Sequence, residues 1–177
     1  MEWSDMAGSL IKIDEEIVTS AVATVELGGA NWDSSYDVYM VKMNNVQCAT
    51  DNKDMRIQLK NGATVLTPYD RASKDFRPDI GFTDNSSNNA TRFDINNATG
   101  NGANETGQGI FYLFNFNNAS EYSFITYETN YITYTNLMIG QQGSGVVKQA
   151  SACDTIVFYW ESASNFASGT FTLYRVV

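Results

Sequence analysis

The chain has 177 residues, with 20 acidic and 11 basic side chains, a formal net charge of −9 and no histidine. Hydrophobic residues make up 43% and charged residues only 18%, which indicates one folded domain rather than a disordered chain. The negative charge argues against a nucleic-acid partner, because phosphate would be repelled. Without histidine there can be no Ser-His-Asp triad and no imidazole metal site.

The sequence also bears on membranes and redox state. No apolar run approaches the length of a membrane span, and the first six residues lack the basic start and apolar core of a secretory signal. We therefore expect no membrane partner and synthesis in the cytosol. Cys48 and Cys153 are far apart in the chain and do not make a disulfide framework, so we expect two buried free thiols.

Alternation of apolar and polar residues with period two dominates the chain. Residues 55–60 show it most clearly, and because Asn61-Gly62 follows, we predict a β-hairpin with a tight turn there and a return strand at 63–66. A run that is apolar on both faces, residues 110–116, predicts a strand buried on both sides. Further strands are expected at 17–27, 36–43, 122–127, 131–139, 155–161 and 170–177. Together they predict an all-β, single-domain antiparallel β-sandwich, with the jelly roll as its specific form.

Four segments depart from this pattern. Residues 69–76, which precede Arg77-Pro78, could form a short helix. Residues 84–109 are rich in Asn and Gly and predict a long surface loop with one short strand at 91–95. Residues 140–145 (Gly-Gln-Gln-Gly-Ser-Gly) predict a flexible connection. Residues 1–9 are expected to be an N-terminal arm ahead of the sandwich domain at 10–177.

Two groups of acidic residues could form a metal site or an active site. The segment from Asp94 to Glu105 resembles a calcium loop in its spacing, but Ala98 stands at a ligand position and the glycine comes one place late, which favours a solvated loop. The second group contains carboxylates that could serve a glycosidase: Asp14, Glu15, Glu16, Asp33 and Asp37. Asp and Glu are common at strand ends, and their presence alone does not indicate an active site. We therefore expect no catalysis, no metal and no cofactor.

Aromatic residues are in surplus, with ten Tyr, ten Phe and three Trp. Those exposed on the surface could form a protein interface or a platform on which sugar rings stack, while alternation places about half of them in the core. Trp3 lies in a polar segment without a core of its own to fill, and we expect it to lie on a neighbouring subunit. The candidate interface residues are Trp3, Met6, Leu10, Tyr131 and Tyr134.

Several segments resemble small virion structural proteins of tailed bacteriophages, especially marine ones. They are residues 36–39 (Tyr-Asp-Val-Tyr), 44–46 (Asn-Asn-Val), 49–51 (Ala-Thr-Asp), 110–115, 154–156 (Asp-Thr-Ile) and 164–174, which contain Ser-Gly-Thr and end on Leu-Tyr. Members of that family typically continue with glycine where this chain has Arg175.

The resemblance implies a non-enzymatic virion protein, above all a capsid decoration (cement) protein that contacts the major capsid protein or other virion proteins. A homo-oligomer, with a trimer as one form, fits such a role. The alternative left open is a module of tail, fibre or baseplate that binds carbohydrate during host recognition.

Overall fold

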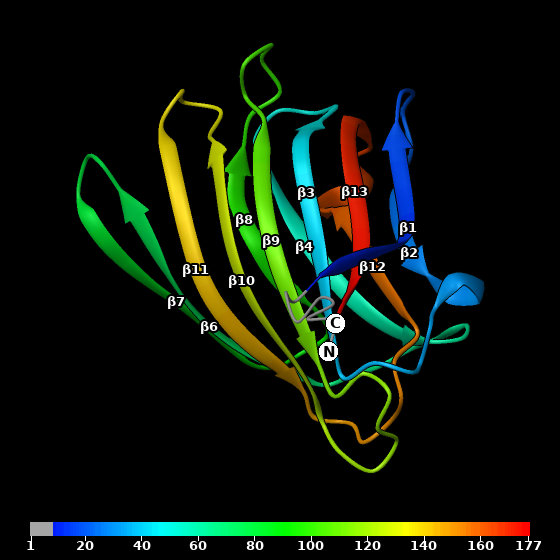
Figure 1. The fold of residues 1–177 in the computed structure, drawn as a ribbon. Coiled ribbons are helices and arrows are strands. Elements are labelled where there is room, and N and C mark those ends of the chain that lie inside the picture. The colour runs from blue at the N-terminus through cyan, green and yellow to red at the C-terminus, as the bar shows by residue number, and fades with distance from the viewer. Residues whose placement is uncertain (1–8) are drawn as a thin grey trace, which may run out of the picture.

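A computed structural model describes residues 9–177 of the protein. These residues form an antiparallel β-sandwich (Figure 1). Two sheets of eight and five strands face each other. The eight-stranded sheet contains, in spatial order, β1 (Leu10–Val18), β13 (Phe166–Val176), β3 (Val38–Cys48), β9 (Gly107–Phe114), β10 (Ser123–Ile132), β11 (Met138–Val147), β6 (Tyr69–Arg77) and β7 (Gly81–Ala90). The five-stranded sheet contains β2 (Thr24–Gly28), β12 (Thr155–Trp160), β4 (Lys53–Asn61) and β5 (Thr64–Val65), with β8 (Phe93–Thr99) also paired to β4.

The chain passes repeatedly between the two sheets. Strands β1 to β4 alternate between them, and so do the successive pairs β8–β9 and β12–β13. Strands β10, β11, β6 and β7 widen the larger sheet on one side, where β6 and β7 swing outward in Figure 1. Short 3₁₀ turns, η1 (Gly29–Asn31) and η2 (Glu161–Ala163), follow β2 and β12. No helix within residues 9–177 has the length and apolar character needed to cross a membrane.

A series of aromatic rings fills the space between the sheets. Phe111 and Phe171 each contact Phe158, with ring centroids 5.5 and 5.1 Å from it. Phe166 lies 5.4 Å from Phe171 and 5.5 Å from Trp160, which continues the series. All five side chains are at most 1% exposed. Each ring pair adds about 0.5–1.5 kcal/mol beyond the burial of apolar area, so this cluster is a main source of cohesion between the sheets.

The predicted hairpin is confirmed, with its turn one residue further along. Asn61 pairs with Thr64, so Gly62 and Ala63 occupy the turn, and Gly62 has a φ of +56° that suits glycine. The two predicted free thiols are also confirmed, because Cys48 and Cys153 are buried and unpaired.

The predicted long loop at 84–109 is wrong. Most of this segment forms β7, β8 and the start of β9, and only residues 91–92 and 100–106 lie outside strands. The Asn and Ser side chains are tolerated in β7 because it is an edge strand whose side chains are largely solvated, where pairing with β6 matters more than intrinsic preference.

Five other local predictions differ from the structure. Residues 69–76 form β6 rather than a helix, and its buried positions include Tyr69, Ser73 and Asp75, two of them polar. Residues 140–145 lie inside β11, paired on both sides, rather than in a flexible connection. Strand β9 is covered on one face only, since Ile110 and Tyr112 are 43% and 41% exposed. The predicted strands at 17–27 and 131–139 are each interrupted by a turn.

The two ends of the described chain lie side by side. The backbone N–H of Ser9 donates to the carbonyl of Val177 at 3.2 Å, and that of Val177 donates to Ser9 at 3.0 Å. This pair extends the ladder between β1 and β13 by one step.

Candidate functional site

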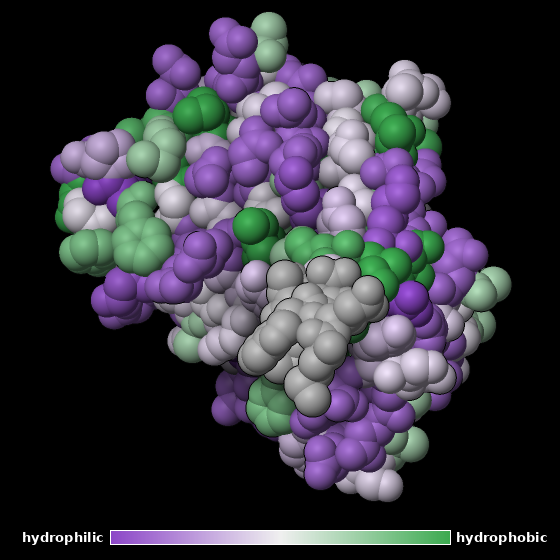
Figure 2. All heavy atoms as spheres, in the orientation of Figure 1, coloured by the Kyte–Doolittle hydropathy of each residue, from purple (hydrophilic) through white to green (hydrophobic). Residues whose placement is uncertain are grey.

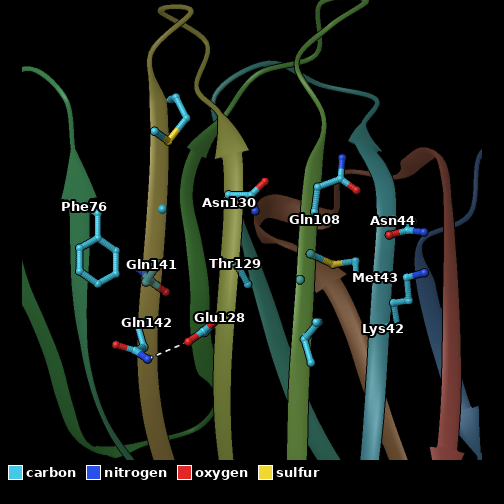
Figure 3. A pocket seen from close by; sticks show the side chains of 14 residues that line it. Lys42, Met43, Asn44, Phe76, Gln108, Glu128, Thr129, Asn130, Gln141 and Gln142 are labelled. Atoms are coloured by element: carbon cyan, nitrogen blue, oxygen red, sulfur yellow. Dashed lines mark hydrogen bonds between the residues drawn. The ribbon is translucent and has the colours of Figure 1, made fainter. Parts of the chain in front are cut away.

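The outward face of the eight-stranded sheet is hollowed where β9, β10 and β11 cross its middle (Figure 3). Three adjoining hollows of about 540, 600 and 360 Å³ share lining residues with their neighbours and form one trough, which we name the outer groove. Its wall and floor are outward-pointing side chains of β3, β9, β10, β11 and β6, with Met138 at the start of β11. They include Lys42, Asn44, Phe76, Gln108, Ile110, Tyr112, Thr126, Glu128, Asn130, Met138, Gln142 and Ser144.

Strand register places these side chains in rows across the sheet. One row runs from Lys42 through Ile110 and Glu128 to Gln142 on four neighbouring strands. Within it, the amide Nε2 of Gln142 donates to Oε1 of Glu128 at 2.8 Å, as Figure 3 shows. The row holds a cation, an anion, an amide and an apolar side chain, so the groove can offer both hydrogen bonds and apolar contact.

The neighbouring row is built from amides and a ring. It runs from Gln108 through Asn130 and Gly140 to Phe76. Asn44 of β3 lines the same hollow. Gln108 is held in place by Asn45, whose backbone N–H donates to Gln108 Oε1 at 2.9 Å and whose side chain accepts from Nε2 at 3.1 Å.

Glycine shapes the floor of the outer groove. Gly140 points outward, and a Cβ built on it would lie 3.5 Å from Cδ2 of Phe76, an ordinary contact distance. Because Gly140 has no side chain, the space between Asn130 and Phe76 stays open. By contrast, Gly143 and Gly145 point inward, where Tyr127 and Phe93 take the space a side chain would need.

The outer groove is electrically balanced although the chain is acidic. The hollow at one end is lined by one anion, Asp70, and one cation, Arg71. The hollow at the opposite end contains one cation, Lys42, and one anion, Glu128. Neither forms an ion pair with another residue of the described range, 9–177. A strongly charged ligand would therefore find little net attraction at this site.

The space-filling view shows the same mixed character over the face of the larger sheet. Hydrophobic residues lie among hydrophilic ones in Figure 2. Exposed apolar side chains that line the trough or lie at its ends are Phe76, Ile110, Tyr112, Phe124 and Met138, between 37% and 46% exposed.

The predicted interface residues that lie within residues 9–177 do not come together. Leu10, on the edge strand β1, is 49% exposed, and Tyr134, in the turn after β10, is 47% exposed. Three strands separate β1 from β10 in the sheet. Tyr131 is 1% exposed, so an interface role for it is wrong: its ring fills the core and its hydroxyl accepts from the N–H of Asn97 at 2.9 Å. Trp3 and Met6 lie outside the described residues.

Two of the acidic residues considered for a glycosidase, Asp14 and Asp33, are engaged in contacts within the fold. Asp14 accepts from the backbone N–H of Gly28 at 2.8 Å and from the amide of Asn31 at 3.2 Å. Asp33 accepts from the backbone N–H of Ser35 and pairs with Arg175, and these contacts lower the pKa of its carboxyl. Arg175, where the phage family has glycine, also lies 4.5 Å above the ring of Tyr36.

The ends of the calcium-like segment serve different contacts. Asp94 accepts from Nε of Arg56 at 3.0 Å and from Nε of Arg92 at 2.9 Å, whereas Glu105 accepts from the backbone N–H of Gly102 at 2.6 Å. Across residues 9–177, no three acidic or thiol side chains gather as a metal ion would require.

No protein-family model, curated protein or solved structure matches the chain. The outer groove could not be predicted directly from the sequence. The predicted strands at 122–127 and 131–139 leave out residues 128–130, which lie inside β10, so Glu128 and Asn130 were not placed on a strand face. Nothing indicated that Phe76, far away in the chain, lies on the same face two strands further on.

Proposed function

We propose that the chain is a non-enzymatic structural protein of a tailed-bacteriophage virion, specifically a capsid decoration protein that stabilises the shell through contacts with the major capsid protein. The observation that carries this proposal is the presence of large exposed apolar side chains at both edges of the eight-stranded sheet. On β1, Leu10, Ile11 and Ile17 are 49%, 38% and 57% exposed. At the other edge, Ile80 just before β7 and Phe82 at its start are 64% and 68% exposed. Exposed apolar groups of this size are typical of interaction surfaces.

Two separate edges suit a protein that joins neighbours. A contact between unlike edges of two copies is head-to-tail, and such contacts close into rings when the rotation allows it. We therefore include a homo-oligomer in the proposal, with a trimer as one such ring. Repeated placement on a symmetric shell then multiplies modest contacts.

The topology supports the same class. We propose that the framework is a jelly roll in which β10, β11, β6 and β7 are additions to the larger sheet. Without them and the two-residue β5, the larger sheet runs β1-β13-β3-β9 and the smaller one β2-β12-β4-β8. When these eight strands are numbered from one to eight in chain order, the strand order is 1-8-3-6 in the larger sheet and 2-7-4-5 in the smaller sheet. Jelly rolls occur in viral capsid proteins and in lectins, so this framework fits both functions considered for the chain.

The test is the copy number of the chain in purified virions, measured by quantitative mass spectrometry against the major capsid protein. We expect a simple whole-number ratio, as for a protein placed on a symmetric lattice. Absence of the chain from clean particles would contradict a virion function.

A second candidate function is favoured by the outer groove. A tail, fibre or baseplate module that binds carbohydrate would need exposed rings beside hydrogen-bonding side chains, and Tyr112 lies one row away from Glu128 and Gln142. A few tens of copies per particle, rather than a lattice ratio, would favour this function over decoration.

A further inference from the structure

We propose that the outer groove binds a neutral oligosaccharide that lies across β3, β9, β10, β11 and β6. This inference deepens the second function proposed above and does not depend on capsid decoration. Neighbouring strands lie about 4.8 Å apart, so the groove crosses about 19 Å of sheet, a span suited to a short oligosaccharide rather than a single sugar.

The chemistry of the groove matches that of a sugar. A saccharide has apolar C–H faces and a rim of hydroxyl groups that donate and accept hydrogen bonds. The rings of Tyr112 and Phe76 are 41% and 37% exposed and offer apolar faces. Between them lie Asn130, Glu128 and Gln142, whose side chains can accept from hydroxyl groups and, for the amides, donate to them.

The charge of the groove favours a neutral ligand. Four charged side chains line the groove, Lys42 and Glu128 toward one end and Asp70 and Arg71 at the other, two of each sign, so neither an acidic nor a basic polymer gains net attraction. Lys42 and Glu128 can still make hydrogen bonds to hydroxyls, which are stronger than bonds between neutral partners.

A peptide fits this surface less well. Peptides commonly bind a sheet by adding a strand to a free edge, where backbone groups are unpaired. Strands β9, β10 and β11 are paired on both sides, so the groove offers side chains rather than backbone to its ligand. Side-chain amides that point away from the sheet are suited to hydroxyl groups.

Gly140 provides a sharp test because it opens the groove without supporting the core. A Cβ there meets only ordinary contacts, and its φ is not in the left-handed region. Valine is favoured in strands, so Gly140→Val should leave the fold intact while its side chain fills the space between Asn130 and Phe76. Thr24→Val, at an exposed position of β2 in the other sheet, is the matched control.

The experiment is isothermal titration calorimetry of the full chain with maltohexaose, cellohexaose, chitohexaose and mannohexaose, and with a galacturonate hexamer as the charged probe. We expect at least one neutral hexasaccharide to bind with a Kd between about 10 µM and 1 mM. Gly140→Val and Tyr112→Ala should each weaken that binding by about tenfold or more, whereas Thr24→Val should not change it. Thermal melting of each variant checks that it is folded.

Three outcomes would overturn the proposal: no neutral hexasaccharide binds, the galacturonate hexamer binds more tightly than all of them, or binding survives unchanged in Gly140→Val. The copy number of the chain in virions is measured independently. A silent titration with a lattice copy number would therefore reject the sugar site alone, and sugar binding by a chain absent from virions would reject the particle function alone.

Discussion

Gly143 lies directly across the β10–β11 ladder from Tyr127, and the ring of Tyr127 occupies the place of the missing side chain. A Cβ on Gly143 would come within 2.6 Å of both Cζ and the hydroxyl oxygen of that ring, and within 2.7 Å of Cβ of Ser73. Tyr127 is 2% exposed, so its ring has little freedom to move aside. Glycine at this position is thus a packing requirement of the larger sheet.

We predict that Gly143→Ala lowers the free energy of unfolding by about 1–3 kcal/mol, because it overfills a close-packed site. Urea unfolding followed by tryptophan fluorescence measures the change. Gly140→Ala on the same strand is the control, and its stability should equal or exceed that of the wild type, because its Cβ meets no close contact. Equal losses in the two variants would contradict this account of β11.

Phe158 is the centre of the aromatic series, with Phe111 and Phe171 on either side. We expect Phe158→Ala to cost about 3–5 kcal/mol, since it removes a fully buried ring and leaves a cavity between the sheets. Phe124→Ala, at a position 44% exposed, should cost much less. Chemical denaturation of both variants decides the matter, and a similar cost at the two sites would count against a core centred on Phe158.

Stability should fall at alkaline pH. Burial raises the pKa of the Cys153 thiol from 9.0 to about 11, and burial likewise raises the pKa of Tyr69 and Tyr131. A group whose pKa is higher in the folded state contributes stability below its unfolded pKa and loses it as the pH rises through the folded value. For Cys153 this window is about pH 9 to 11, and the loss is about 2 kcal/mol.

Urea unfolding at pH 7, 9 and 10.5 tests this window. The free energy of unfolding should be nearly constant up to pH 9 and then decline. Cys153→Ala should start lower, because it leaves a small void, but decline less steeply. Parallel pH profiles for the variant and the wild type would show that the thiol does not contribute.

Ile17→Lys and Phe82→Lys test the apolar edges that support the decoration proposal. Both positions are more than half exposed, so each substitution should leave the thermal stability of the isolated chain nearly unchanged. We expect either one to weaken binding to particles that lack the chain by about tenfold or more, since a charge would be buried at the contact. Thr24→Lys is the control, and particle binding that is unaffected by both edge substitutions would argue against these edges as the contact.

Local patterns in the sequence were sufficient for the class of fold and for the strongest elements. Alternation and Asn61-Gly62 predicted the β4–β5 hairpin, although the paired residues place the turn one position later. The glycines of β11 suggested flexibility because their local preference is for turns, whereas their actual function depends on Tyr127 and Phe93, which lie on other strands. Such a requirement is set by tertiary contacts and is invisible in a short window.

The candidate site was harder to predict from the sequence, again because it depends on tertiary contacts. Residues 128–130 fall between the predicted strands 122–127 and 131–139, although they continue β10 and carry part of the groove. The groove depends on Phe76 opposite Gly140 and on Lys42 in line with Ile110, and these pairings join distant parts of the chain. Strand β6 was predicted as a helix over 69–76 because two of the strand's buried positions, Ser73 and Asp75, are polar. The alternation of apolar and polar residues that indicates a strand is therefore missing there.

The pairing of Ser9 with Val177 has a consequence for the construction of fusions. Because the two residues exchange backbone hydrogen bonds, a short Gly-Ser linker can join residue 177 to residue 9 without crossing the domain. New termini can then be opened at the exposed Gly62-Ala63 turn, at the far end of the β4–β5 hairpin. A circularly permuted chain of this kind would present an attached label from the smaller sheet instead of from the β1–β13 edge.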